Sequence, residues 1–106
     1  MFTIEIPDHN DNLVEVELDE EIFFLHFSWN ETAQYWTLSI ENAYNDELIS
    51  CLPLLPHRAL IQPVRNNELP LGELITIRED DHATIGRADF KNGTAQLVYV
   101  SVDDEL

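Results

Sequence analysis

Hydrophobic and polar residues alternate along much of the chain with a period of two, which is the period of a β-strand. Two further stretches, residues 74–77 and 97–102, are rich in β-branched and aromatic residues, which favour strands. No stretch shows helical periodicity over more than two turns. The pattern therefore predicts an all-β chain of about seven strands, and its clearest alternating stretches are residues 2–6, 14–18, 23–29 and 35–40.

A short polar loop, residues 31–34, separates two of the predicted strands. A four-residue loop at this position sets Trp29 opposite Trp36 in an antiparallel hairpin. The two indole rings then point into the same layer. We interpret both tryptophans as core anchors, and a role at an interface is the alternative.

The dipeptide Asn92-Gly93 is the strongest hairpin signal in the chain, because both residues tolerate the positive φ of a type I′ turn. A two-residue loop there predicts that Phe90 lies opposite Ala95. The middle of the chain is different, since residues 53–70 contain four of the five prolines. Proline lacks a backbone N–H, so this segment is expected to be irregular, with short extended pieces.

The length of 106 residues is typical of one domain, and no repeat or linker divides the chain. We predict a single β-rich domain over residues 1–106, folded as a small antiparallel barrel or a two-layer sandwich. Residues 22–25, Ile-Phe-Phe-Leu, are apolar on both faces of their strand. Either this is a central strand covered on both sides, or one face, with Phe24, is a subunit contact.

The charge distribution is strongly uneven. The formal net charge is −16, and the first 57 residues contain twelve of the 21 acids and none of the five Lys and Arg residues. Such a surface repels phosphate, which excludes direct binding to nucleic acid or to an anionic membrane. We identify an acidic patch that either meets a basic partner or keeps DNA away, and it consists of Glu15, Glu17, Asp19, Glu20 and Glu21.

Motifs for catalysis or for cofactor and metal binding are not found. The chain has no nucleophile elbow, phosphate loop or dinucleotide fingerprint, and no histidine pair at metal-ligand spacing. Asp8-x-Asn10-x-Asn12 begins like a calcium loop, but Leu13 replaces the required glycine, so a polar turn is expected. We predict no enzymatic activity, no cofactor and no metal. The single Cys51 is expected to be a buried small hydrophobe.

The sequence also lacks a run of about 18 apolar residues and a signal-peptide pattern at its start, so we expect no membrane span and no secretion.

Several short motifs resemble, in order and spacing, the small baseplate plug proteins of contractile-tailed bacteriophages, of the cyanophage type. The resemblance covers roughly residues 20–102. The motifs are Phe27-x-Trp29-Asn30, Tyr35-Trp36-Thr37-Leu38, Leu52-Pro53-Leu54-Leu55, Leu69-Pro70-Leu71-Gly72-Glu73-Leu74 and Leu97-Val98-Tyr99-Val100.

This resemblance implies a structural virion component without enzymatic activity, on the central axis of the tail baseplate. Its implied partners are hub, spike or tail-tube proteins, in a symmetric homo-oligomer for which we favour a trimer. It would be assembled in the host cytoplasm. Gly72 and Tyr99 are structural candidates within the matching motifs, Gly72 at the fourth position of a type I turn. Two alternatives remain, an acidic DNA-mimic inhibitor and a small acidic adaptor or immunity protein.

Overall fold

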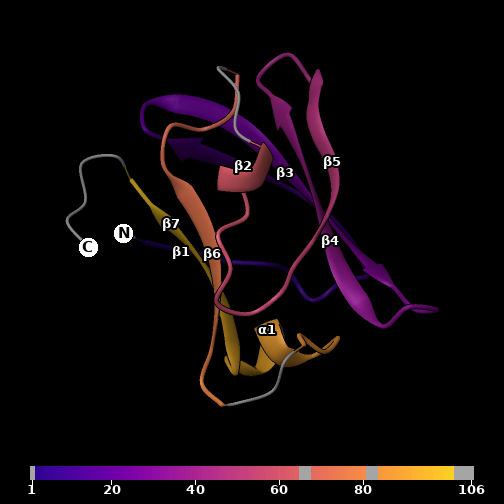
Figure 1. Cartoon of the computed structure of the whole chain (residues 1–106). Helices are drawn as coiled ribbons and strands as arrows, with labels where there is room; N and C mark the ends of the chain where they lie inside the picture. Colours follow the sequence, from indigo (N-terminus) through magenta and orange to yellow (C-terminus); the bar gives the residue numbers. More distant parts are fainter. Residues whose placement is uncertain (1, 65–67, 81–83, 102–106) are drawn as a thin grey trace.

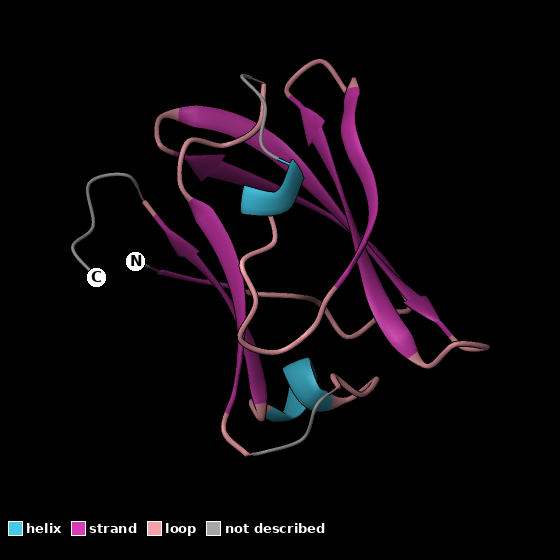
Figure 2. Ribbon diagram, in the orientation of Figure 1, coloured by secondary structure: helices cyan, strands magenta, loops and turns pink. Residues whose placement is uncertain are grey.

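The computed structural model describes residues 2–64, 68–80 and 84–101. They form two antiparallel sheets, which order their strands as β1-β7-β6 and β2-β3-β4-β5 (Figures 1 and 2). The elements are β1 (Phe2–Ile4), β2 (Asp11–Leu18), β3 (Glu21–Asn30), β4 (Tyr35–Asn42), β5 (Glu47–Pro53), the 3₁₀ turn η1 (Gln62–Val64), β6 (Glu73–Arg78), the short helix α1 (Asp89–Asn92) and β7 (Ala95–Val100).

The sheets do not close into a barrel, so the predicted all-β fold is confirmed in its two-layer sandwich form. One core fills the space between the two layers. Along β3, burial alternates strictly, because every second side chain points into that core. The largest fully buried side chains come from both sheets and from the middle segment, and they include Trp36, Tyr99, Phe23, Phe27, Leu74 and Ile61.

The predicted tryptophan hairpin is confirmed. β3 and β4 pair in the expected register, with Trp29 opposite Trp36. The two rings meet edge to face, with centroids 5.5 Å apart, which is a favourable arrangement of aromatic quadrupoles. Trp36 is fully buried, and Trp29 is nearly so.

The predicted hairpin at Asn92-Gly93 is wrong. Asn92 ends helix α1, and Gly93, with a φ of 79°, is the left-handed residue that terminates it. Ala95 consequently pairs with Arg78 of β6 and not with Phe90. The dipeptide signals a positive φ correctly, but a helix end uses this conformation as readily as a hairpin does.

A two-residue hairpin of this kind joins β2 to β3 instead. Leu18 pairs with Glu21, and the intervening Asp19 and Glu20 have φ angles of 51° and 69°. Positive φ at both central residues is the requirement of a type I′ turn. Neither residue is glycine, so this turn carries a conformational cost that other contacts must offset.

The proline-rich segment is irregular, as predicted, and it runs from β5 of one sheet to β6 of the other (Figure 1). Isolated bridges attach it to β6, with Ala59 opposite Ile75 and Pro56 opposite Thr76. The Glu73 carboxylate accepts the backbone N–H of Ile61 at 2.6 Å. These contacts place Ile61 in the core although the segment has no strand of its own.

Two sequence-based expectations about single side chains are wrong. Cys51 is exposed, because β5 has an irregular register here and Cys51 itself has a φ of 56°. The described residues leave the outer face of β3 partly uncovered, since Ile22 is exposed and Phe24 is half-buried. The interpretation of β3 as a strand covered on both faces therefore fails.

No helix within the described residues is long and apolar enough to cross a membrane.

Candidate functional site

Tyr99 contacts two other residues singled out in the sequence, Gly72 and Asp19. It lies in β7 with its side chain fully buried. Its hydroxyl accepts the backbone N–H of Gly72 at 2.7 Å and donates to the Asp19 carboxylate. The ring therefore links the start of β6 to the β2–β3 turn across the sandwich.

Gly72 is required by the close approach of its neighbours. A Cβ atom at this position would lie 2.2 Å from the Val100 carbonyl oxygen and 2.6 Å from the Tyr99 hydroxyl. Contacts this short are essentially never seen for real Cβ atoms, so any side chain would displace the end of β7. Its φ lies outside the left-handed region, so the reason for glycine here is space.

The acidic patch is divided by the fold. Glu15 and Glu17 are exposed on the outer face of β2, and Glu20 and Glu21 are exposed at the hairpin end. Asp19 is half-buried and accepts hydrogen bonds from Tyr99 and Ser101, so it is less exposed than the four glutamates. The acidic patch itself stays a prediction. The Asp19 carboxylate supports the strained turn.

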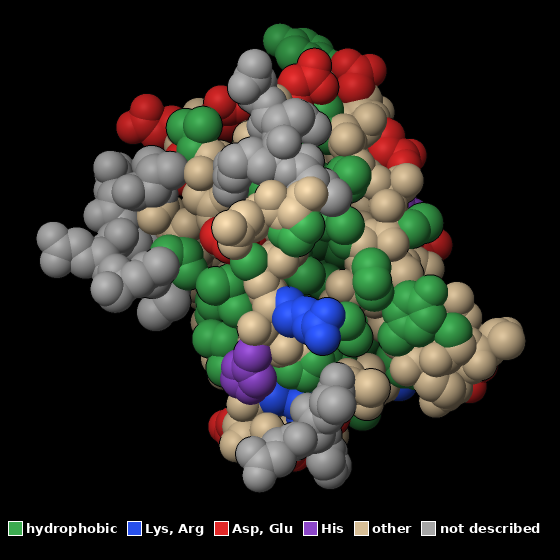
Figure 3. Space-filling model, in the orientation of Figure 1, with side chains coloured by type: hydrophobic (Ala, Val, Ile, Leu, Met, Phe, Trp, Pro, Cys, Tyr) green, Lys and Arg blue, Asp and Glu red, His purple; other side chains and the backbone are tan. Residues whose placement is uncertain are grey.

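One group of exposed acids lies at the end of the molecule where two of the hairpins turn. The upper part of Figure 3 shows several acidic side chains where the β2–β3 and β4–β5 turns lie in Figure 1. The basic side chains visible in the same view lie lower down, which agrees with the absence of Lys and Arg from the first 57 residues. The uneven charge of the sequence is thus also uneven in space.

Phe24 lies in the middle of the outer face of the four-stranded sheet. The register places Glu15 of β2 and Glu41 of β4 directly opposite it, one on each side. Ile22 and Leu13 are exposed on the same face. We call this surface the Phe24 face, and it consists of Leu13, Glu15, Glu17, Ile22, Phe24 and Glu41.

Trp36 of β4 contacts the residues that precede β7, from Gly86 to Phe90. The Arg87 guanidinium lies 5.3 Å from the centroid of the Trp36 ring, within the range of a cation–π interaction. The Phe90 ring packs edge to face on the same indole, with a centroid distance of 6.1 Å. The indole N–H of Trp36 donates to the Gly86 carbonyl oxygen at 3.3 Å.

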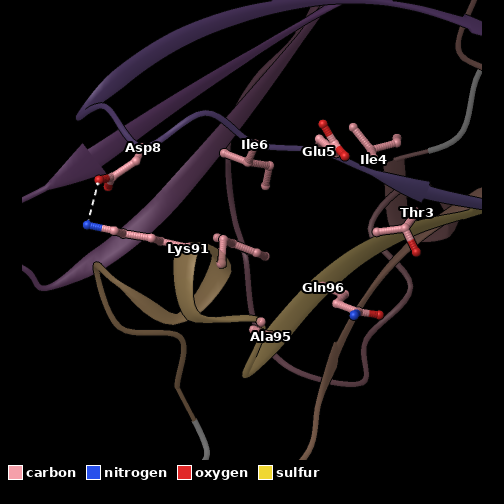
Figure 4. A pocket seen from close by; sticks show the side chains of 10 residues that line it. Thr3, Ile4, Glu5, Ile6, Asp8, Lys91, Ala95 and Gln96 are labelled. Carbon is pink, nitrogen blue, oxygen red and sulfur yellow. Dashed lines mark ion pairs between the residues drawn. The ribbon is translucent and has the colours of Figure 1, made fainter.

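The same segment is tied to the β1–β2 connection by charge. Asp8 pairs with Arg87 at 2.9 Å and with Lys91 at 3.2 Å, and Figure 4 shows the pair with Lys91. Lys91 and Arg87 lower the pKa of the Asp8 carboxyl from its ordinary value, because their hydrogen bonds favour the ionised form. This cluster could not be predicted from the sequence, since Asp8 and Arg87 are 79 residues apart.

Arg78 organises the residues between β6 and α1. Its side chain is buried and pairs with Asp80 at 2.6 Å and with Asp89. It also donates to the Thr84 carbonyl oxygen at 3.1 Å. Asp80 and Asp89 raise the pKa of the Arg78 guanidinium above its ordinary value, so this buried group stays charged.

A cavity of about 380 Å³ lies between β1, β7 and α1, with the Asp8–Lys91 pair beside it (Figure 4). Its lining combines aliphatic side chains such as Ile4 and Ile6 with polar ones such as Gln96. Within residues 2–64, 68–80 and 84–101, no group of three His, Cys, Asp or Glu residues could hold a metal ion. Of the three charged side chains that line the cavity, Glu5, Asp8 and Lys91, the last two pair with each other and so link the β1–β2 connection to α1.

All of these clusters join strands and loops of a small β-sandwich. The chain belongs to the cyanophage baseplate plug family, because the family model described as "Cyanophage baseplate Pam3 plug gp18" matches residues 1–103. This match confirms the resemblance seen in the sequence motifs. The family assigns the chain to the structural proteins of a phage tail baseplate. No curated protein sequence matches the chain.

Proposed function

We propose that this chain is a non-enzymatic plug on the central axis of a contractile-tail baseplate, where it assembles with hub, spike or tail-tube proteins. The observation that carries the proposal is the family match over residues 1–103, nearly the whole chain. The internal contacts support it. Tyr99 and Trp36 each connect segments that are distant in the sequence, and Arg78 holds the residues between β6 and α1, as expected of a protein that must keep its shape within an assembly.

The absence of an enzymatic role is supported by what the charged groups contact. Asp8 and Lys91 pair with each other beside the cavity, and Arg78 is occupied by Asp80 and Asp89. A catalytic acid or base needs access to a substrate proton, and these groups are directed at protein partners instead.

The net charge of −16 supports a position near the DNA path. Acidic side chains repel DNA over about 8 Å at physiological salt, so the packaged or ejected genome does not adhere to the plug. We therefore propose that the chain does not bind nucleic acid directly. A mobility-shift assay with double-stranded DNA checks this, and a retarded band at physiological salt would contradict it.

A plug on the axis of a symmetric baseplate must match that symmetry, so we propose a symmetric homo-oligomer, with a trimer as the favoured state. The assembly forms in the host cytoplasm and becomes part of the virion.

The decisive experiment is cryo-electron microscopy of baseplates from the phage that encodes this chain, beside particles in which its gene carries a stop codon and is complemented in trans. We expect density on the tail axis in complemented particles and its loss in the mutant. Mass spectrometry of purified virions gives an independent result. Virions that lack the chain, or density away from the axis, would overturn the proposal.

A further inference from the structure

The Phe24 face has an apolar centre that no other part of the described chain fully covers. Leu13 is 59% exposed and Ile22 is 39% exposed, and Phe24 lies half-buried between them. Most of the outward side chains of an antiparallel sheet are expected to be polar when they face water. Three apolar side chains on neighbouring positions of β2 and β3 therefore mark a contact surface.

The carboxylates of this face restrict what can cover it. Glu15 and Glu41 flank Phe24, and Glu17 lies opposite Ile22. Within the part of the chain that the structure describes, the Lys and Arg ion pairs involve Asp8, Asp80 and Asp89, and none reaches these three glutamates. Packing of this face against itself would oppose like charges, which disfavours a twofold contact.

A second surface of the chain has complementary properties. A groove of about 160 Å³ runs between the end of β5 and the proline-rich segment. Apart from Arg58, its lining is apolar, and it consists of Leu52, Pro53, Leu55, Arg58, Ala59, Leu60 and Pro63. We call it the Arg58 groove.

Arg58 differs from the other basic residues that the structure describes. Arg78, Arg87 and Lys91 are each paired with an aspartate. Arg58 is exposed and makes no ion pair with any acid among the described residues. The groove therefore presents apolar walls with an available cation, and the Phe24 face presents an apolar centre with available carboxylates.

We propose that the Phe24 face of one copy docks into the Arg58 groove of the next copy, in a head-to-tail contact. In this contact Phe24 and Ile22 lie against the apolar groove walls. The Arg58 guanidinium reaches the carboxylates beside Phe24, in a position from which it can also lie over the aromatic ring. Because the two surfaces differ, repetition of the contact closes a ring or extends a chain of subunits. The inference rests on the proposed homo-oligomer and identifies its two surfaces.

Charge reversal tests the contact on the purified full-length protein at physiological salt. Light scattering after size exclusion and sedimentation over a dilution series give the dissociation constant. We expect Arg58→Glu and Glu15→Arg each to raise this constant at least 10-fold. The double variant, which restores opposite charges, is expected to regain most of the lost affinity. Phe24→Ala should weaken the contact to a similar extent.

The matched control is Glu5→Arg, which changes the same charge at an exposed position off the Phe24 face and should leave the constant unchanged. Urea unfolding of each variant confirms that the fold persists. A wild-type protein that stays monomeric at the highest concentration overturns the inference. An oligomer that survives both single reversals, or a double variant without recovery, also overturns it.

Incorporation of the same variants into virions separates the two proposals. Axial density in virions together with a purified wild-type protein that stays monomeric would contradict the head-to-tail contact and leave the plug function intact. Absence of even the wild-type chain from the virion would contradict the plug function.

Discussion

The hydroxyl of Tyr99 donates a hydrogen bond to the carboxylate of Asp19, a residue 80 positions earlier in the chain. Asp19 occupies the first central position of the β2–β3 turn, with a positive φ. The bond therefore connects the central strand of one sheet to a strained turn of the other. This hydrogen bond stabilises the turn and so offsets the conformational cost of its two positive φ angles.

Tyr99→Phe tests the importance of this bond. The change removes the acceptor of the Gly72 N–H and the donor to Asp19 while it keeps the buried ring. We expect a loss of about 1–3 kcal/mol in the free energy of unfolding, because the lost bonds are in a desolvated position. Urea unfolding, followed by tryptophan fluorescence, measures it. Tyr35→Phe is the control, since no hydrogen bond is found for the half-buried Tyr35 hydroxyl within the described residues, and equal losses would contradict the expectation.

Gly72→Ala is expected to be more harmful than a typical Gly→Ala change. The new methyl group would lie 2.2 Å from the Val100 carbonyl oxygen, so β7 must move. We expect a loss of about 1–3 kcal/mol, which is the usual cost of overpacking a core. Differential scanning calorimetry measures the change in Tm.

Gly93→Ala provides the comparison for Gly72→Ala. A Cβ at Gly93 meets no atom within 4 Å, and its φ of 79° is the only source of cost. We expect about 1 kcal/mol from this left-handed conformation. A smaller loss for Gly72→Ala than for Gly93→Ala would show that the space at Gly72 is not the constraint.

Glu20→Gly should stabilise the protein. Glu20 has a φ of 69°, a conformation that costs a residue with a Cβ about 1–2 kcal/mol and glycine almost nothing. Part of the gain is lost to the entropy of glycine in the unfolded chain, so we expect a net gain of about 0.5–1 kcal/mol. Glu21→Gly removes the same charge from the adjacent strand position and should destabilise. If both variants shift stability in the same direction, charge and not turn geometry is responsible.

Asp8→Asn is expected to alter the acid dependence of stability. The pKa of Asp8 is lowered in the folded protein, so its pairs with Lys91 and Arg87 contribute stability above its unfolded pKa of about 3.8. This contribution is lost as the pH falls through the lower, folded pKa. The wild-type protein should therefore exceed the variant in stability at pH 6, and the difference should shrink as the pH falls below the unfolded value of about 3.8. Parallel curves in urea unfolding between pH 6 and 2.5 would contradict this assignment.

Strand content and the tryptophan hairpin could be predicted from the sequence because both depend on local patterns. Alternation of apolar residues fixes which side of β3 faces the core, and a four-residue loop fixes the Trp29–Trp36 register. For residues 22–25 the sequence left two interpretations, a strand covered on both faces or a subunit contact. The first is wrong for the described residues, because Ile22 is exposed, and the second stays a prediction.

Turn types could not be predicted, because the same dihedral angles serve different structures. Asn92-Gly93 has the composition of a hairpin turn but ends a helix, whereas Asp19-Glu20 has an unfavourable composition and forms the hairpin. The hairpin at Asp19-Glu20 is supported by a hydrogen bond from Tyr99, which lies 80 residues away, so the residues next to Asp19 do not predict it. The Asp8 cluster was missed for the same reason, because Arg87 and Lys91 are distant in sequence.

The pairing of β1 with β7 has a consequence for how the chain is made. Phe2 lies opposite Tyr99, so the first and last strands are neighbours, and the β2–β3 turn is also held by Tyr99. During synthesis, the N-terminal hairpin leaves the ribosome long before the strand that completes it. We expect nascent chains that end before residue 95 to remain protease-sensitive, and folding to begin only when β7 emerges. Before β7 is available, we expect repulsion between the acids of the first half to reduce association between incompletely folded chains.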